Sequence, residues 1–271
     1  MHLDKKSSDE IREVIIEAID VLKFRNENPF RDEKSGVDQL IPYLYQPKQE
    51  LSGYLDELKV FLETEKPAKI EKQQAGYLLE KILLLAFMGL EGYSEIKSYQ
   101  SASHQHDLLI SGENTNKAWK TVCEALCLRD SQKNQFYRGI LCEAKAIEGS
   151  VSVNTFSRLC HIINMEFQDT VGLGVFFTIK GATGFPKRGD TRNRCVRDAR
   201  LCQIIHYARS GKKVIVLDKD DIFELNQSGA LIKILIRKIK EIEELTGLPT
   251  TSIDNVIDVD LPEHLKDLYN D

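Results

Sequence analysis

The sequence GILCEAKA, at residues 139–146, is an apolar run interrupted by one carboxylate, Glu143, and one ammonium, Lys145. Its apolar, extended character predicts a strand. Successive side chains of a strand alternate between its two faces, so Glu143 and Lys145 share one face while Cys142 and Ala144 share the other. Burying either charge is costly unless it is paired or bound to a metal ion. The pattern therefore has two interpretations, a simple Glu–Lys pair at a sheet edge or part of a catalytic site.

Two further carboxylates favour the catalytic interpretation. Asp107 lies on a short predicted strand at 106–110, and Glu80 lies within the apolar run of a predicted helix at 71–90. If the two strands are neighbours, Asp107 and Glu143 can bind the same metal ion. Glu80 either points to that polar centre or occupies a solvent-facing position of its helix, and the sequence alone leaves both open.

This set of side chains suits the hydrolysis of phosphodiester bonds. Hard cations such as Mg²⁺ or Mn²⁺ prefer oxygen ligands, which Asp107 and Glu143 offer, with Glu80 supporting a second position. Such a metal ion polarises a phosphoryl oxygen and lowers the pKa of a bound water molecule. An ammonium beside it, here Lys145, can orient the water or stabilise charge that develops on the phosphate.

The order of the predicted elements indicates an α/β fold with helices on both faces of a sheet, because strands alternate with helices in the second half of the chain. We expect a helical appendage at 1–68, available for interactions, a catalytic core at 69–226, and a C-terminal helix and tail at 227–271. Periodicity predicts helices at 9–24, 49–63, 71–90, 118–128, 155–166, 190–210 and 231–245, and strands at 94–99, 106–110, 136–146, 171–179 and 213–217.

From residue 71 to 217, the chain resembles the PD-(D/E)xK superfamily of nucleases, and most closely its Mrr-like branch. The resemblance implies a restriction-endonuclease-like fold, a mixed central sheet flanked by helices. It also implies that Asp107 is the motif aspartate, that Glu143 and Lys145 form the E-x-K pair, and that Glu80 is the helix carboxylate. Members often place a supporting polar residue on the next helix, and the corresponding positions are Thr155 and Arg158.

The chain departs from the family pattern in two respects. No proline precedes Asp107, and 36 residues separate Asp107 from Glu143, which is longer than a tight hairpin requires. We expect a helical insertion at about 115–135 to account for the separation. Glu124 and Asp130 are alternatives for the first acidic residue.

A basic segment follows the predicted strand at 171–179. Ten Lys or Arg and two Asp lie between residues 180 and 213, a net charge of +8, so the rest of the chain carries −13 of the total of −5. Arg194, Arg197 and Arg200 are spaced to line one helix face. The segment is either a solvated face with local partners or a phosphate-contacting surface, and the acidic site beside it favours the second. The residues we expect to contact nucleic acid are Lys187, Arg188, Arg192, Arg194 and Arg197.

Several other classes of function find no support in the sequence. It contains neither a GxxxxGK[ST] phosphate loop nor a serine nucleophile elbow, and no apolar run is long enough for a bilayer. His104 and His106 share a strand face but lack a third ligand at a suitable spacing. The six cysteines form no CxxC pair, so we expect buried free thiols, with a structural zinc site as the alternative. The polar N-terminus suggests a cytoplasmic protein.

The sequence therefore predicts a metal-dependent nuclease that acts on nucleic acid, DNA in preference to RNA. The resemblance suggests an effector subunit of a defence system against phage or plasmids, and cleavage of a duplex suggests a homo-oligomer or larger complex. The alternative is a catalytically silent subunit that binds nucleic acid or other proteins.

Overall fold

The structure is a computed structural model that describes residues 36–64, 69–100, 105–113, 115–130, 135–145, 149–185 and 196–246. The predicted helix at 9–24 and the tail beyond residue 246 lie outside these residues. Among the residues described, no helix is both long enough and apolar enough to cross a membrane.

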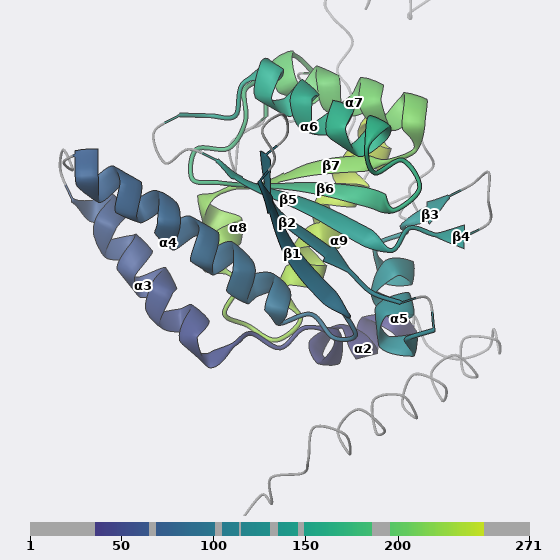
Figure 1. Cartoon of the computed structure of the whole chain (residues 1–271), viewed down its shortest axis with the longest axis horizontal. Coiled ribbons are helices and arrows are strands. Elements are labelled where there is room, and N and C mark those ends of the chain that lie inside the picture. Colours follow the sequence, from purple (N-terminus) through teal and green to yellow (C-terminus); the bar gives the residue numbers. More distant parts are fainter. Residues whose placement is uncertain are drawn as a thin grey trace, which may run out of the picture.

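A mixed sheet of five strands forms the centre of the molecule (Figure 1). Its strand order is β1-β2-β5-β6-β7, in which β1, β2 and β5 are antiparallel neighbours and β5, β6 and β7 run parallel. The strands are β1 (Glu95–Gln100), β2 (Gln105–Ser111), β5 (Gly139–Lys145), β6 (Val171–Thr178) and β7 (Lys213–Leu217). The predicted α/β class with a mixed sheet is thereby confirmed.

Helices cover both faces of this sheet. One face carries α6 and α7, which pack side by side, and the other carries α4 and α9 (Figure 1). The helices are α2 (Gly36–Leu44), α3 (Gln49–Glu63), α4 (Lys69–Met88), α5 (Lys117–Ala125), α6 (Val153–Met165), α7 (Asp198–Ser210), α8 (Lys219–Phe223) and α9 (Ala230–Leu245). Two short strands, β3 (Arg129–Asp130) and β4 (Gln135–Phe136), form a separate ribbon.

The side chains of β5 alternate as their sequence predicts. Ile140 and Cys142 belong to the larger core cluster, which includes buried residues of α4 and α9. Leu141 belongs to the second cluster, which includes buried residues of α6 and α7. Glu143 is two residues beyond Leu141 and therefore faces α6. Because β5 lies between β2 and β6, the Glu–Lys pair is not at a sheet edge.

The described part of the predicted appendage, residues 36–64, contributes to the core of the same body. Leu44, Tyr45 and Leu58 are fully buried in the cluster that includes the apolar face of β5. The hydroxyl of Tyr45 donates to the carbonyl of Leu225 at 2.7 Å, and its backbone pairs with Leu90. A segment separate from the core, as the sequence suggested, is therefore not seen in these residues.

Two further predictions concern the segment between residues 115 and 135 and the start of α7. The insertion predicted at about 115–135 is confirmed, since α5 and the β3–β4 ribbon follow β2 and precede β5 along the chain. The helix predicted at 190–210 is wrong in its start, because α7 begins at Asp198 and residues 196 and 197 are not helical.

Candidate active site

The register of β2 and β5 brings the two predicted acidic residues together. Leu108 is the Cα partner of Cys142 in this antiparallel pair, so Asp107 lies one step further along, opposite Glu143. The two strands are therefore neighbours, as a shared site of Asp107 and Glu143 requires. The Asp107 carboxylate reaches across to β5 and accepts a hydrogen bond from the backbone N–H of Ala144.

Glu143 is buried, and its two carboxylate oxygens have different surroundings. The Arg158 guanidinium donates to Oε1 at 2.6 Å, and the Lys145 ammonium lies 3.0 Å from the same oxygen. Oε2 is inaccessible to solvent and has no hydrogen-bond partner among the described residues. A carboxylate oxygen left unpartnered in the interior is costly, and it is the arrangement expected of a ligand for a cation.

The pKa of Asp107 is raised to about 6, mainly because the carboxyl is partly buried. The neighbouring carboxylates of Glu80 and Glu143 raise it further, while the hydrogen bond from Ala144 and the charge of Lys145 oppose the change. An acidic group that resists ionisation beside other carboxylates is a frequent feature of functional sites. A bound cation would remove this resistance.

Glu80 approaches the site from the opposite side of the sheet to Arg158. It lies on α4, whose neighbouring residues Leu79, Ile82 and Leu83 are buried against the sheet, and its own side chain is exposed. Its charge nevertheless contributes to the raised pKa of Asp107. Glu80 therefore occupies a solvent-facing position of its helix, and whether it supports a metal ion stays a prediction.

The two predicted supporting residues differ in what they contact. Arg158, on α6, forms the ion pair with Glu143. Thr155 lies in the first turn of α6, where its backbone N–H and its hydroxyl both lie within hydrogen-bonding distance of the Ser152 hydroxyl, at 3.3 and 3.1 Å. Thr155 therefore helps to cap the helix that carries Arg158.

Of the residues expected to contact nucleic acid, only Arg197 is described. Lys187, Arg188, Arg192 and Arg194 lie outside the described residues. Arg197 is exposed at the N-cap of α7, with an extended backbone, and its guanidinium is 3.8 Å from Asp198. The prediction that Arg197 and Arg200 line one face is wrong, because Arg200 is buried within the helix while Arg197 precedes it.

Arg197 nevertheless lies at the same edge of the sheet as Glu143 and Lys145. Backbone hydrogen bonds connect the segments that follow β5 and β6 to the start of α7, from Thr183 N–H to the Val151 carbonyl and from Ala199 N–H to the Thr183 carbonyl. These segments follow the carboxyl ends of the parallel strands, the edge at which α/β sheets commonly bind ligands.

Asp107 and Glu143 fit a hard divalent cation by their chemistry. Among the described residues, no group of three or more His, Cys, Asp or Glu side chains is close enough to hold a metal ion. Two carboxylates are sufficient for Mg²⁺, which usually retains several water molecules. The unpartnered Glu143 Oε2 is the observation that fits such an ion most directly.

The alternatives to Asp107 lie elsewhere. Glu124 is on α5, and Asp130 is on β3. The ring N–H of Trp119, also on α5, donates to the Arg138 carbonyl, which places this helix beside the start of β5, whereas Glu143 lies near its end. The sequence analysis missed the backbone N–H of Ala144, which orients Asp107. No side-chain pattern reveals such a donor.

The remaining candidates take no part in this site. His161 is exposed on α6, and the side chains of His104 and His106 lie outside the described residues. His206 is buried, and its pKa is lowered to about 4 by burial. Of the cysteines described, Cys123, Cys142 and Cys160 are buried free thiols as predicted, whereas Cys127 is exposed and Cys202 partly so.

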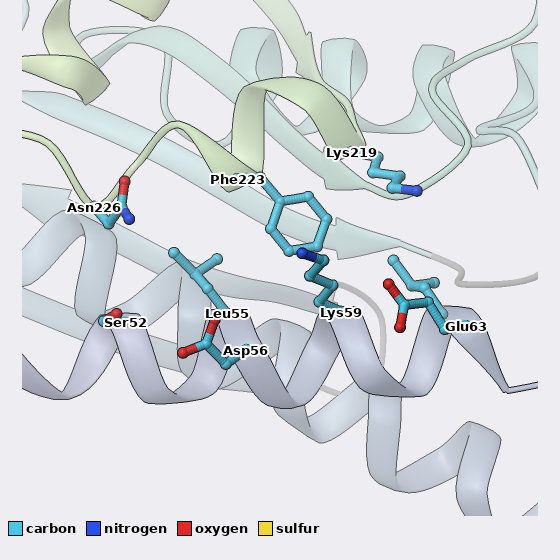
Figure 2. A pocket seen from close by; sticks show the side chains of 9 residues that line it. Ser52, Leu55, Asp56, Lys59, Glu63, Lys219, Phe223 and Asn226 are labelled. Atoms are coloured by element: carbon cyan, nitrogen blue, oxygen red, sulfur yellow. The ribbon is translucent and has the colours of Figure 1, made fainter.

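A cavity of about 430 Å³ lies between α3 and α8, away from the predicted site residues. Figure 2 shows Phe223 projecting from α8 above Lys59 of α3. The wall of the cavity carries both signs of charge and three large apolar side chains. The lining residues are Ser52, Leu55, Asp56, Lys59, Leu62, Glu63, Lys219, Phe223 and Asn226.

Comparison of the chain with protein-family models, with curated proteins and with solved structures finds no match. Function is therefore inferred from the arrangement of five side chains, those of Asp107, Glu143, Lys145, Arg158 and Glu80.

Proposed function

We propose that the protein is a metal-dependent nuclease that hydrolyses phosphodiester bonds of nucleic acid, with Mg²⁺ or Mn²⁺ held by Asp107 and Glu143. The observation that carries the proposal is the buried Oε2 of Glu143, which has no partner although Oε1 of the same carboxylate has two. A purely structural ion pair would gain stability by satisfying both oxygens. Leaving one oxygen unpaired next to a second carboxylate, that of Asp107, suits a ligand site.

The side chains around the two carboxylates have separate roles. Arg158 and Lys145 hold Oε1 of Glu143, which fixes the direction of Oε2. The backbone N–H of Ala144 fixes Asp107 in the same way. A bound Mg²⁺ supplies a Lewis acid for the phosphoryl oxygen and lowers the pKa of a water molecule. Lys145 is partly exposed, so its ammonium can also reach a phosphate oxygen and stabilise the charge that develops there.

Arg197 supports nucleic acid as the substrate class, because it is an exposed cation at the same sheet edge as the carboxylates. Contacts of such cations with phosphate provide affinity without reading sequence. The resemblance of residues 71–217 to PD-(D/E)xK nucleases favours DNA over RNA. It also favours a role as an effector within a homo-oligomer or larger complex.

The test is cleavage by the purified chain of supercoiled plasmid, linear duplex, single-stranded DNA and RNA, each in Mg²⁺, Mn²⁺ or EDTA. Two variants address the site, Glu143→Gln and Lys145→Met. Glu124→Gln, beside the opposite end of β5, is the matched control. Circular dichroism establishes that each variant is folded.

Cleavage that requires the metal ion, is lost in Glu143→Gln and Lys145→Met, and persists in Glu124→Gln would establish the nuclease and its site. Cleavage that survives in both site variants would remove the site assignment. A wild-type protein that binds nucleic acid but cuts none of the four substrates would favour the alternative, a catalytically silent subunit.

A further inference from the structure

Two thiols from neighbouring helices meet on the side of the sheet covered by α6 and α7. Cys160 belongs to α6 and Cys202 to α7, and these helices pack against one another (Figure 1). Both cysteines are free. Ser157, one turn before Cys160 on α6, has its hydroxyl beside the Cys202 sulfur, so the two thiols lie on facing sides of the two helices. Cys160 is buried, whereas Cys202 is partly exposed. A small reagent can therefore reach Cys202 before it reaches Cys160.

The surroundings make the two sulfurs chemically unequal. The Ser157 hydroxyl lies 3.2 Å from the Cys202 sulfur. The neighbouring Cys160 thiol and the Ser157 hydroxyl lower the pKa of Cys202 to about 6, whereas the interaction with Cys202 and burial raise the pKa of Cys160 well above its ordinary range. At neutral pH the pair therefore consists of an accessible thiolate and a neutral thiol behind it. This is the arrangement of thiols that respond to oxidants.

We propose that Cys202 and Cys160 form a reversible oxidative modification site, in which Cys202 reacts with a peroxide and Cys160 resolves the product as a disulfide between α7 and α6. In the first step the Cys202 thiolate attacks hydrogen peroxide, an S–O bond forms, the O–O bond breaks, and hydroxide leaves with a proton from solvent as water. In the second, the Cys160 sulfur attacks the sulfenic acid, the S–S bond forms, and the S–O bond breaks to release water. The two thiols lose two electrons, which the peroxide gains.

The other described cysteines lack this combination. Burial raises the pKa of Cys123 to about 12 and that of Cys142 well above its ordinary value, so neither offers a thiolate at neutral pH. Cys127 is an exposed free thiol in the segment that follows α5. It therefore serves as the reference thiol for the pair. The proposal is independent of the nuclease activity, since neither sulfur contacts the carboxylates of the candidate site.

The first experiment maps the disulfide. The purified chain is treated with an equimolar amount of hydrogen peroxide, blocked with iodoacetamide, and digested with trypsin without reduction. Cleavage after Arg158, Lys180, Arg200 and Arg209 separates the two cysteines into peptides 159–180 and 201–209, neither of which contains another cysteine. We expect these two peptides to appear as one species, two hydrogens lighter than their sum, which dithiothreitol separates. Cys202→Ser and Cys160→Ser should each abolish it, and Cys127→Ser should leave it unchanged.

The second experiment measures reactivity without requiring the bond to form. At pH 7 a pKa of about 6 makes the Cys202 thiolate about a hundredfold more abundant than at an ordinary pKa of 9.0. The lower basicity of that thiolate reduces its nucleophilicity by roughly twentyfold, which leaves a net advantage of about fivefold in the rate of alkylation by iodoacetamide. Ser157→Ala should reduce that advantage, because it removes the hydroxyl that lies 3.2 Å from the sulfur.

Two results would overturn the proposal. The first is conversion of Cys202 by peroxide to a sulfinic acid, or to a disulfide with a cysteine other than Cys160, such as Cys195. The other is alkylation of Cys202 in the folded chain no faster than that of Cys127, with no change in Ser157→Ala.

Discussion

Replacing Asp107 with asparagine should stabilise the metal-free protein at pH 7.5, although it damages the proposed site. Burial and the charges of Glu80 and Glu143 raise the pKa of Asp107 from 3.8 to about 6 in the folded chain. The folded state therefore ionises this group less readily than the unfolded state does. As pH rises through the unfolded pKa toward 6, the fold loses stability, and the loss is complete above pH 6. Asparagine carries no charge and escapes this cost.

The magnitude follows from the same pKa. A rise from 3.8 to about 6 corresponds to about 3 kcal/mol, at roughly 1.4 kcal/mol for each pH unit. Because the carboxyl is only partly buried, solvent screens part of this energy, and about 1–2 kcal/mol is a realistic expectation. Asparagine has nearly the same shape, and its carbonyl oxygen can still accept the hydrogen bond from Ala144. Asp107→Asn should thus raise the free energy of unfolding by about 1–2 kcal/mol at pH 7.5 and hardly at all at pH 4.

Urea denaturation in EDTA measures this directly, with the fluorescence of the single tryptophan, the buried Trp119, as the signal. The control is Asp56→Asn on the exposed surface of α3, which should change stability by less than about 0.5 kcal/mol at either pH. A destabilised Asp107→Asn protein at pH 7.5, or a stabilisation of equal size at pH 4 and pH 7.5, would refute the reasoning. In the first case Asp107 would be a net stabilising residue, and in the second its charge would be irrelevant.

Three further pairs of substitutions test stability, one at the candidate site and two elsewhere in the fold. Arg158→Ala should lower the free energy of unfolding by about 1–3 kcal/mol, because it removes one of the two cations on buried Glu143, whereas Arg209→Ala on the exposed part of α7 should have little effect in the same urea assay. Gly112→Ala should cost about 1–3 kcal/mol, since a Cβ there would lie 2.2 Å from the Trp119 ring. Gly53→Ala should instead stabilise the protein by about 0.5–1 kcal/mol, because Gly53 is helical in α3 and a Cβ there would have nothing within 4 Å. A higher melting temperature for Gly112→Ala than for Gly53→Ala would contradict both predictions. Tyr45→Phe should cost about 1–2 kcal/mol through loss of the buried hydrogen bond to Leu225, while Tyr43→Phe, 56% exposed, should leave the melting temperature unchanged; equal effects of the two would mean that the buried hydrogen bond of Tyr45 adds nothing to stability.

Local periodicity accounts for what the sequence predicted correctly. The prediction that residues 139–146 form a strand was enough to assign Glu143 and Lys145 to one face, because side chains two apart on a strand share a face in any register. The helix at 49–63 was predicted with the bounds it has, since its buried residues Leu51, Leu55 and Leu58 recur at the spacing of a helix.

What the sequence did not reveal depends on contacts between distant segments. Tyr45 is buried through its partners Leu90 and Leu225, and no local pattern signals those contacts. The start of α7 was placed too early because arginine has high intrinsic helix propensity, whereas the backbone of Arg197, just before Asp198, is extended. Arg200 was expected on the surface as an arginine usually is, yet it is buried, and its charge opposes the rise that burial causes in the pKa of Glu241.

The charges around the candidate site lead to a last prediction, on the role of the metal ion in substrate binding. Three carboxylates, those of Glu80, Asp107 and Glu143, face two cations, Lys145 and Arg158, which leaves a net charge of −1 when all are ionised. A phosphodiester carries a charge of −1 and should be repelled. A divalent cation changes the site to +1, and the phosphodiester then neutralises it.

Binding of a short oligonucleotide should therefore be tighter in Ca²⁺, used as a cation of similar ligand preference, than in EDTA at equal ionic strength. The double variant Asp107→Asn, Glu143→Gln should lose this response, because its site carries +1 without a metal ion and lacks the ligands to bind one. Its affinity in EDTA should equal or exceed that of the wild type, whereas Glu124→Gln should retain the wild-type response. An affinity of the wild type that is the same in Ca²⁺ and in EDTA would mean that nucleic acid, if it binds at all, binds away from these carboxylates.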